Sequence, residues 1–245
     1  MRRDRTTEPP LVVYGANAVL ELLRSDVPVE RVYLGRGPQE AMLAAAARER
    51  GLGATAADRG TLDRVAGSPH HQGAVATGPP FPYAPLPTLL DPGCGSALVL
   101  DEVQDPRNLG AILRTARAAG VGGVVLPRDR SVGVTAVVAS ASAGLLFQLR
   151  IARVPNVVRA MEELKNASFW LVGLVTSGGT PLPSLDPPPR PALVVGGEGE
   201  GLRQLVRRTC DFTTTIPMAP GVDSLNVAVA SGIALYELLL RRPRT

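Results

Sequence analysis

The stretch of residues 194–202, VVGGEGEGL, runs from apolar residues into a glycine-rich loop that carries two carboxylates, Glu198 and Glu200. Glycine-rich loops that follow a strand commonly cradle phosphates. The dinucleotide spacing G-x-G-x-x-G fails, because Leu202 stands where the third glycine counted from Gly197 is required, and no Gly-Lys-Ser/Thr follows. A carboxylate 4 Å from a phosphate costs about 1 kcal/mol even in water. The loop is either a tight surface turn or a site whose ligand is neutral or cationic near the carboxylates.

A second stretch, DEVQDPRNLGAILRTARAAGV at residues 101–121, predicts a strand followed by a helix. Asn108 is the expected N-cap, Leu109 begins an apolar stripe at i, i+3, i+4 and i+7, and Gly120 is the expected stop. Arg114 lies about 140° around the helix from Leu109, off that stripe. Asn108 and Arg114 are therefore free to face a ligand, unless the segment is simply a capped surface helix.

The third stretch, residues 216–240, begins with a proline-interrupted loop that holds Asp223, Ser224 and Asn226. It continues into a helix that is apolar nearly all round, and such a helix must be covered on every side. Alanine, serine and glycine residues between 228 and 234 would let another backbone approach closely. The pattern is consistent with a buried C-terminal helix or a dimer interface, and we favour both at once.

Composition narrows the class of protein. The 245 residues are 45% apolar and 20% charged, so the chain can build a core. Its net charge of +4 has the sign of a nucleic-acid binder. Two histidines and two distant cysteines, Cys94 and Cys210, argue against a metal site. The sequence has no apolar run of membrane-spanning length and no secretory pattern at its N-terminus, so we expect a cytoplasmic protein without membrane spans.

Helices and strands must hold these three segments in place. A proline-rich stretch divides those helices and strands into two domains. Six prolines fall within residues 79–92, which predicts a semi-stiff linker over residues 78–96. Residues 1–77 are then a small α/β domain and residues 97–245 a second, larger one. Apolar periodicity in the first domain predicts helices at 17–24, 40–51 and 60–66, and strands at 31–35, 53–57 and 73–78.

In the second domain, strands alternate with helices. The expected strands are 97–103, 122–127, 147–154, 169–174, 191–197 and 212–217. Four of them are near-continuous apolar runs, as in parallel strands covered on both faces. The domain is therefore an open, mostly parallel α/β sheet, whose ligands bind beyond the carboxyl ends of the strands.

The segments DPRNLGAILRTARAAG, VVGGEGEGL and IPMAPGVDSLNVAVASGIALYE together resemble, in order and spacing, the three signature motifs of the SpoU (TrmH) family of SPOUT RNA methyltransferases. The resemblance covers residues 97–240. In the first domain, VYGANAVLELL and HHQGAVA resemble the small ribosomal-protein-L30-like RNA-binding domain of one subgroup. That subgroup includes the enzyme that methylates a guanosine ribose in large-subunit ribosomal RNA.

The resemblance implies an RNA 2′-O-methyltransferase that uses S-adenosylmethionine, with a trefoil knot and an obligate homodimer. General rules of chain topology would not have predicted a knot. The positions matching the catalytic residues of the family are Asn108, Arg114, Glu198, Ser224 and Asn226. Those matching its cofactor site, which share three of these, are Gly196, Gly197, Glu198, Gly199, Gly201, Ile216, Met218, Ser224, Leu225 and Asn226.

The family account makes the arginine matching Arg114 the activator of the ribose hydroxyl. An arginine guanidinium, whose pKa generally exceeds about 12, is a poor base at neutral pH. We predict instead that Arg114 clamps the substrate phosphate and stabilises the negative charge that develops on O2′. RNA contacts are also expected from the first domain and from basic residues near the strand ends: Arg107, Arg128, Arg130, His71 and Gln72.

Three alternatives stay open on the sequence. The RNA substrate could be transfer RNA, since only the small first domain favours ribosomal RNA. A catalytically silent RNA-binding relative is disfavoured because all five catalytic positions are filled, and a nucleotide-dependent oxidoreductase by the failed loop spacing. Residues 139–156 depart from the family by being more apolar, at Leu145 and Leu146, which puts substrate contacts there in doubt.

Overall fold

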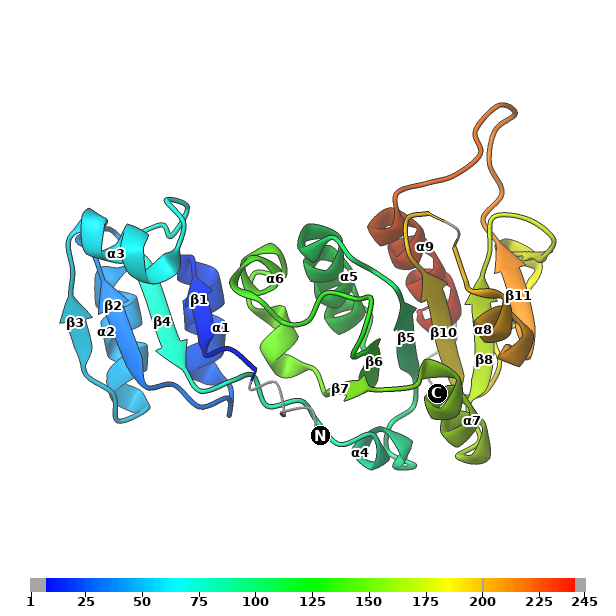
Figure 1. Cartoon of the computed structure of the whole chain (residues 1–245), viewed down its shortest axis with the longest axis horizontal. Coiled ribbons are helices and arrows are strands. Elements are labelled where there is room, and N and C mark those ends of the chain that lie inside the picture. The colour runs from blue at the N-terminus through cyan, green and yellow to red at the C-terminus, as the bar shows by residue number, and fades with distance from the viewer. Residues whose placement is uncertain (1–7, 200, 241–245) are drawn as a thin grey trace, which may run out of the picture. The chain divides into compact units, whose positions relative to one another are not determined.

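The computed structural model describes residues 8–199 and 201–240. The chain forms two compact units, one of Met1–Pro82 with Val134–Phe147 and the other of Tyr83–Gly133 with Gln148–Thr245 (Figure 1). Glu200, whose role the sequence left unexplained, lies outside the described residues. Within the described ranges, none of the helices is both long and apolar enough to cross a membrane.

The first unit is built on a four-stranded sheet in the order β1-β4-β2-β3. Strand β4 is antiparallel to both β1 and β2, whereas β2 and β3 are parallel. Its main elements are β1 (Leu11–Tyr14), α1 (Ala16–Arg24), β2 (Arg31–Leu34), α2 (Glu40–Glu49), β3 (Ala54–Ala56), α3 (Arg59–Ala66) and β4 (Ala74–Gly78). Each predicted helix and strand of this region is present. Strand β1 was not predicted.

Local chemistry explains where these helices begin and end. The Asp58 side chain accepts a hydrogen bond from the backbone N–H of Thr61 at 2.8 Å and caps α3, which ends at Gly67 with a φ of 63°. At the end of α1, the Arg50 guanidinium donates to the carbonyl oxygens of Leu22 at 2.7 Å and Leu23 at 3.2 Å. One long side chain thus satisfies carbonyls that a helix C-terminus leaves without partners.

Residues 134–147 pack against α1 and β1 of the first unit. They form α6 (Ala136–Ala141) and most of the 3₁₀ turn η1 (Leu145–Gln148), and Leu146 is fully buried. At Gly144, whose φ is 81°, a Cβ would lie 2.9 Å from the Cα of Ala18. The apolar departure from the family pattern is therefore core packing at Leu146, whereas Leu145 is only partly buried. The strand expected from residue 147 begins only at Ile151, because the preceding residues form η1.

The second unit holds a seven-stranded sheet in the order β7-β6-β5-β10-β8-β11-β9, with parallel pairing throughout. This confirms the predicted parallel α/β architecture. Its strands are β5 (Ala97–Asp101), β6 (Gly123–Pro127), β7 (Ile151–Val154), β8 (Trp170–Leu174), β9 (Thr180–Pro181), β10 (Pro191–Gly196) and β11 (Phe212–Thr215). The other elements are α4 (Pro87–Leu90), α5 (Pro106–Ala118), α7 (Val157–Asn166), η2 (Leu182–Ser184), α8 (Gln204–Thr209) and α9 (Val227–Leu239).

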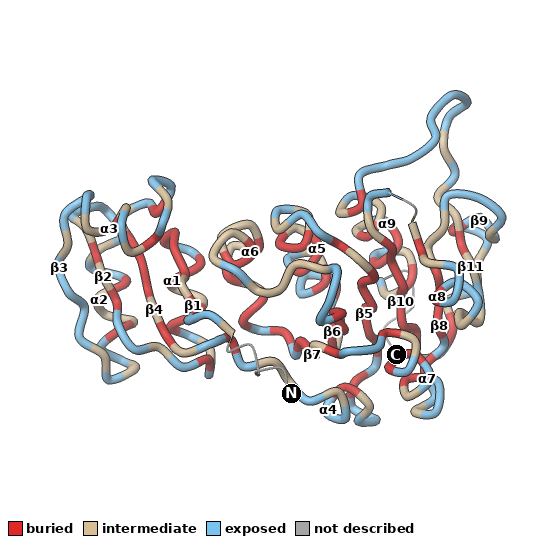
Figure 2. Tube along the Cα trace, in the orientation of Figure 1, coloured by how far each residue is buried: buried red, intermediate tan, exposed pale blue. Residues whose placement is uncertain are grey.

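The central strands of this sheet are buried along their whole length (Figure 2). Alternate residues such as Val99, Val125 and Val194 pack in one cluster with the apolar residues of α7 and α8. Successive side chains of a strand point to opposite faces, so Leu98 and Leu100 face the other way. Helices α5 and α9 pack against one another, and α9 also packs on β10. Both faces of the sheet are thus covered, which is why its strands are continuous apolar runs.

The proline-rich segment contributes buried side chains: Phe81 in the first unit, and Leu89 and Cys94 in the second. The Arg190 guanidinium holds the latter part of the segment. It donates to the carbonyl oxygens of Cys94 at 2.9 Å and Leu90 at 3.1 Å. It also lies 3.9 Å from the centre of the Phe169 ring. Residues 83–96 therefore fold onto the second unit as part of its structure.

Candidate active site

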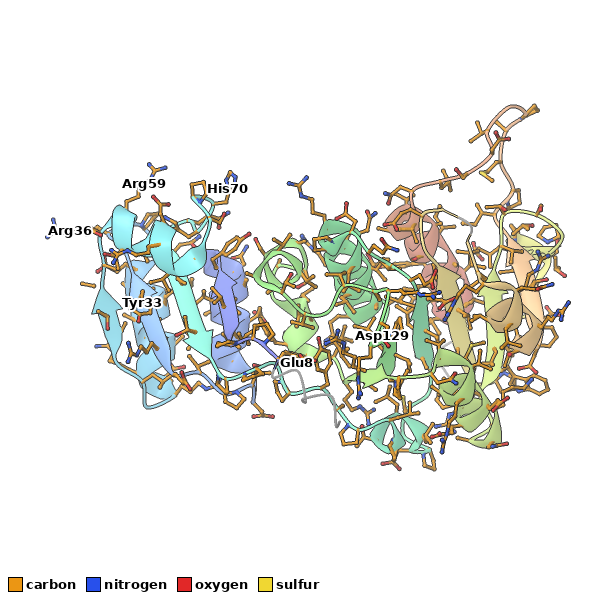
Figure 3. The ribbon with its side chains drawn as sticks, in the orientation of Figure 1. Glu8, Tyr33, Arg36, Arg59, His70 and Asp129 are labelled. Carbon is orange, nitrogen blue, oxygen red and sulfur yellow. The ribbon has the colours of Figure 1, made fainter. Side chains whose placement is uncertain are left out.

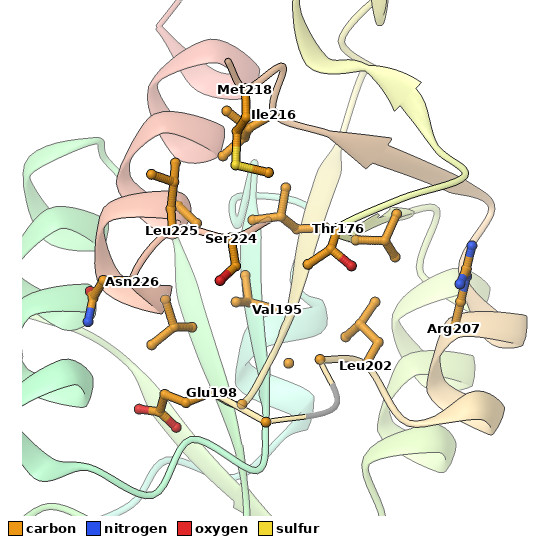
Figure 4. Close-up of a pocket in the computed structure, with 18 residues that line it drawn as sticks. Thr176, Val195, Glu198, Leu202, Arg207, Ile216, Met218, Ser224, Leu225 and Asn226 are labelled. Atoms are coloured by element: carbon orange, nitrogen blue, oxygen red, sulfur yellow. The ribbon is translucent and has the colours of Figure 1, made fainter. Parts of the chain in front are cut away.

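A cavity of about 420 Å³ opens at the carboxyl ends of β8 and β10, beside the loops that follow β10 and β11 (Figure 4). This is the edge at which open parallel sheets bind ligands. The cavity brings together all the residues that the sequence placed at a cofactor site: Gly196, Gly197, Glu198, Gly199, Gly201, Ile216, Met218, Ser224, Leu225 and Asn226.

The glycine-rich loop approaches other backbone too closely for any side chain at two positions. A Cβ on Gly196 would lie 2.1 Å from the carbonyl carbon of Gly201. A Cβ on Gly197 would lie 2.4 Å from the backbone oxygen of Glu102. Gly197 and Gly201 also form a bridge across the loop, and Gly201 has a φ of 69°. These glycines allow the loop to fold back on itself and wall the cavity with backbone.

Three polar side chains, one from each sequence segment, form a hydrogen-bonded chain at one side of the cavity. Asn226 begins α9, and its Oδ1 accepts from the backbone N–H groups of Ala228 at 2.9 Å and Val229 at 3.3 Å. Its Nδ2 donates to Asn108 Oδ1 at 3.1 Å, and Asn108 Nδ2 donates to Glu198 Oε1 at 2.6 Å. Because Asn226 Oδ1 accepts backbone N–H groups at the helix cap, its Nδ2 is the group that donates to Asn108, which in turn donates to Glu198. The Glu198 carboxylate is the final acceptor of the chain.

Asn108 is therefore a site residue, but it is not the N-cap that the sequence predicted. Helix α5 begins three residues earlier than expected, with Pro106 in its first turn. Asp105 is the cap, since its side chain accepts from the backbone N–H of Arg107 at 2.6 Å. Proline suits the first helical position because it has no N–H to satisfy. Placed within the first turn, Asn108 has its side-chain amide available for Glu198 and Asn226.

The predicted RNA-binding arginines of the second unit lie outside the cavity lining. Arg114 is exposed on α5, two turns beyond the start of that helix. Arg107 and Arg128 are also exposed. Arg130 has a φ of 59° and lies 3.4 Å from the carboxylate of Glu102. The structure thus leaves these arginines exposed, while Asn226 and Glu198 of the hydrogen-bonded chain line the cavity.

The two predicted RNA contacts of the first unit have different surroundings. The His71 ring is buried, and both of its nitrogens are engaged. Its Nδ1 accepts from the backbone N–H of Gly73 at 3.0 Å, so the other ring nitrogen, Nε2, carries a proton toward Asp63 Oδ1 at 3.2 Å. Gln72 is exposed, with a φ of 52°. His71 holds the turn from within, and Gln72 presents its side chain to solvent.

A buried ion pair that the sequence did not reveal anchors the far end of the glycine-rich loop. Asp101 is fully buried at the end of β5, next to Gly196 in the sheet register. Arg203 Nε lies 3.0 Å from each of its carboxylate oxygens. These hydrogen bonds raise the pKa of the Arg203 guanidinium above its ordinary value. Arg203 directly precedes α8, so the pair ties the end of the loop to the strand beside its beginning.

Replacing Arg203 by alanine is expected to destabilise the protein and weaken ligand binding in the cavity. The change leaves the Asp101 carboxylate buried without its guanidinium. We expect the free energy of unfolding to fall by about 3 kcal/mol. This is the low end of the range for buried ion pairs, because Arg203 is partly exposed to solvent. Urea unfolding measures this. The double variant Asp101→Asn/Arg203→Met should recover part of the loss, and equal stability of Arg203→Ala and wild type would contradict the anchoring role.

The cavity can hold a ligand that is apolar in part and lacks a polyphosphate. Its walls combine backbone of the glycine loop with aliphatic side chains such as Val195 and Met218. Figure 4 shows Glu198 and Asn226 at one side and Arg207 at the other. Within the described residues, no group of three or more histidine, cysteine or acidic side chains is arranged for a metal ion. The polar side chains that line the cavity are the hydroxyls of Thr176 and Ser224, the amide of Asn226, the carboxylate of Glu198 and the guanidinium of Arg207.

Each of the two units matches a known family model. Residues 95–236 match the family model described as the SpoU rRNA Methylase family, and residues 12–84 match one described as RNA 2′-O ribose methyltransferase substrate binding. Among curated relatives, a putative TrmH family tRNA/rRNA methyltransferase, YacO of Bacillus subtilis, is 37% identical over 238 residues. That alignment covers 94% of this chain and 95% of the relative.

Two solved structures resemble the fold over 95% of this chain, each with a TM-score of 0.81. One is an AdoMet-bound rRNA methyltransferase from Sinorhizobium meliloti, 26% identical and covered over 87% of its length. The other is the SpoU methyltransferase AviRb from Streptomyces viridochromogenes in complex with AdoMet, 25% identical and covered over 90%. The signature segments, the cavity they enclose and these matches lead to one conclusion: the chain belongs to the SpoU family and is an S-adenosylmethionine-dependent RNA methyltransferase.

Proposed function

We propose that this enzyme methylates the 2′-oxygen of a ribose in ribosomal RNA, at a guanosine of the large subunit. The observation that carries the 2′-O assignment is the match of residues 12–84 to the substrate-binding model of RNA 2′-O ribose methyltransferases. The ribosomal assignment is supported by the S. meliloti rRNA methyltransferase, which resembles this chain over both units. The guanosine rests on the resemblance of the first unit to the subgroup that modifies one.

The residues of the cavity fit S-adenosylmethionine. Gly196 and Gly197 pack closely against the backbone of Gly201 and Glu102, so this side of the cavity is walled by backbone without bulky side chains. Ile216, Met218 and Leu225 offer apolar contact, and the Glu198 carboxylate favours positive charge nearby. S-adenosylmethionine supplies a methyl group on a positively charged sulfur. The acid in the loop, unsuited to a polyphosphate, is thus suited to this ligand.

The side chains of this enzyme act mainly by positioning. Fixed alignment of reacting groups can supply about 7–11 kcal/mol of a reaction barrier. The chain from Asn226 through Asn108 to Glu198 holds three polar groups rigid at the cavity edge, and Ser224 adds a hydroxyl. We assign these groups to orienting the ribose and the methyl donor. Arg114 binds the RNA phosphate and stabilises negative charge on O2′, while the proton leaves late to phosphate or water.

RNA binding in this proposal uses the first unit and the exposed arginines Arg107, Arg114, Arg128 and Arg130. Aromatic residues are only 4% of the chain, so recognition rests mainly on backbone shape and phosphate contacts. Binding that neutralises phosphates releases counterions, so affinity falls steeply with added salt.

The knotted connectivity is part of the same proposal. Strand β10 lies between β5 and β8 although it follows both in the chain. The cavity is lined by the segments that follow β8, β10 and β11, which are far apart in sequence. In a trefoil knot the chain passes through one of its own loops, which would hold these three segments together without a disulfide or metal. The strand order and the cavity lining support the trefoil knot expected of the family.

The homodimer of the proposal is supported by one face of α9. Val229, Ile233, Tyr236 and Leu240 are 39–52% exposed and recur at i, i+4, i+7 and i+11, so they share one face. The buried residues of α9 pack against helix α5 and strand β10. Apolar side chains gathered on one exposed face mark an interaction site in a protein of this kind.

Charges introduced on this face are expected to dissociate the dimer. The double variant Val229→Glu/Ile233→Glu would bury two carboxylates in the interface, so it should elute with the mass of a monomer in size-exclusion chromatography with light scattering. Leu205→Glu on α8, at a residue 61% exposed, is the matched control and should keep the mass of wild type. A double variant with unchanged mass would remove α9 from the interface.

The experiment that tests the function maps 2′-O-methyl groups in ribosomal and transfer RNA from cells with and without this gene. One ribose in large-subunit ribosomal RNA should lose its methyl group when the gene is deleted and regain it on complementation. Loss confined to a transfer RNA would make that the substrate, and no lost methyl in either RNA would overturn the 2′-O proposal.

A further inference from the structure

The first unit contains a second cavity, of about 900 Å³, remote in sequence from the methyl-transfer motifs. It opens where the parallel strands β2 and β3 end and β4 begins, and its lining includes Gly35, Ala56 and Leu62. The carboxyl ends of parallel strands are a common location for ligands. Its volume falls within the range of about 300–1,000 Å³ typical of small-molecule pockets.

Basic side chains stand at the mouth of this cavity. Arg36 and Arg59 both line it and are exposed. Figure 3 shows Arg36 and Arg59 directed outward at the same end of the unit as His70, whereas Tyr33 lies against the sheet. Guanidinium groups in this position can bind the phosphates on either side of a nucleotide.

The acidic residues near the cavity have identifiable roles. Asp58 caps helix α3 through its bond to Thr61, and Asp63 faces the buried His71 ring. Glu40 also lines the cavity, and a carboxylate there can accept hydrogen bonds from the amino groups of a base. The cavity lining therefore combines two guanidinium groups with small apolar residues and with the carboxylates of Glu40 and Asp58.

The turn formed by residues 71–73 is fixed in an unusual conformation at the cavity rim. Gln72 and Gly73 both have positive φ angles, 52° and 78°. Residue types other than glycine adopt this conformation at a cost, and such strain persists where the surroundings hold it. Here the buried His71 ring accepts the N–H of Gly73 and contacts Asp63, so it holds the turn and directs Gln72 outward.

We propose that this cavity binds one unpaired nucleotide of the RNA substrate, with the base inside and its flanking phosphates on Arg36 and Arg59. A base inside a helix cannot enter such a cavity, and sequence-dependent recognition of RNA generally uses bases that are splayed out. The inference rests on the proposed function for the existence of an RNA substrate. It adds that the first unit selects an RNA with an unpaired residue outside the methylated position.

A steric variant separates this pocket from general electrostatic attraction. Ala56→Phe would place a bulky ring in part of the cavity without altering charge, and Thr55→Phe is the matched control because the neighbouring residue of β3 points to the opposite face. The probes are a labelled single-stranded RNA oligonucleotide and a duplex of the same sequence, measured by fluorescence anisotropy. Ala56→Phe should weaken single-strand binding about tenfold or more, as expected for one lost base contact, with little effect on the duplex.

A charge variant tests the mouth of the cavity. Arg36→Ala/Arg59→Ala should weaken single-strand binding more than Arg24→Ala/Arg48→Ala, which removes two exposed arginines elsewhere in the same unit. Circular dichroism verifies that each variant is folded. Equal affinities of Ala56→Phe and Thr55→Phe for the single strand, or equal losses in the two arginine pairs, would overturn the proposal.

These measurements involve no methyl transfer, so they stand apart from the test of the function. If the enzyme methylates no ribosomal RNA but the cavity variants behave as expected, the proposed substrate is wrong and the nucleotide pocket remains. If methylation occurs and Ala56→Phe leaves the KM for RNA unchanged, the pocket proposal fails while the function stands.

Discussion

A Gly196→Ala enzyme is expected to show no binding of S-adenosylmethionine by titration calorimetry. The added Cβ would lie 2.1 Å from the carbonyl carbon and oxygen of Gly201 and 2.4 Å from the backbone N of Leu202. Real contacts of a Cβ are far longer, and backbone atoms cannot rotate away as a side chain can. Gly196 is held on one side by its pairing with Asp101 in β5, so the strand cannot yield. The loop must open instead, and the cavity wall is lost.

Gly95→Ala is the control, in the same unit but outside the cavity lining. No heavy atom lies within 4 Å of its added Cβ, and its φ is not in the left-handed region. This variant should bind the cofactor with nearly the affinity of wild type. Thermal unfolding followed by circular dichroism establishes whether Gly196→Ala is folded at the temperature of titration. Retained cofactor binding by Gly196→Ala would mean that the loop does not form the wall of the cofactor site.

The residues that line the cavity could be predicted because each segment that contributes them has a recognisable local sequence pattern. The apolar run before Gly196 identifies a buried strand, and parallel sheets place ligands where such strands end. The segments around Met218 and Asn226 were placed beside it through the resemblance to the family, since no spacing in one sequence brings residues so far apart together. In the structure that placement follows from the strand order, in which β8 alone separates β10 from β11, the strand that precedes these segments.

Other features depend on pairings that leave no local pattern. Asp101 and Arg203 are 102 residues apart, and nothing in the sequence around either one indicates that they form an ion pair. The packing of residues 134–147 against the first unit is similar, since an apolar Leu146 predicts burial but not the partner that buries it. The N-cap of α5 was misplaced because Asp105 and Asn108 are both good caps, and the proline between them, at the first helical position, decides in favour of Asp105.

Replacing Arg114 by alanine is expected to abolish detectable methyl transfer while leaving cofactor binding largely intact. The side chain is exposed on α5 and lies outside the cavity lining, so its loss leaves the cofactor walls unchanged. A guanidinium can bind phosphate through two parallel hydrogen bonds and stabilise charge on a neighbouring oxygen. Loss of one donor of this kind typically lowers kcat by about 10²–10³-fold, and lost alignment of the RNA adds to that.

Transfer of labelled methyl groups to ribosomal RNA measures the rate, and calorimetry measures cofactor affinity. Arg159→Ala removes an exposed arginine from α7, where it pairs with Glu163 at 3.3 Å, and is the control for loss of positive charge.

The variant Arg114→Lys distinguishes the two possible roles of Arg114, phosphate binding and proton removal. A lysine retains charge but cannot form the two-pronged phosphate contact, so it should recover only part of the activity. Activity that rises with pH in the lysine enzyme would instead point to proton removal, because a lysine loses its proton far more readily than an arginine. An Arg114→Ala enzyme as active as Arg159→Ala would exclude this side chain from both roles and leave the positioned chain of Asn226, Asn108 and Glu198 to act on the ribose without it.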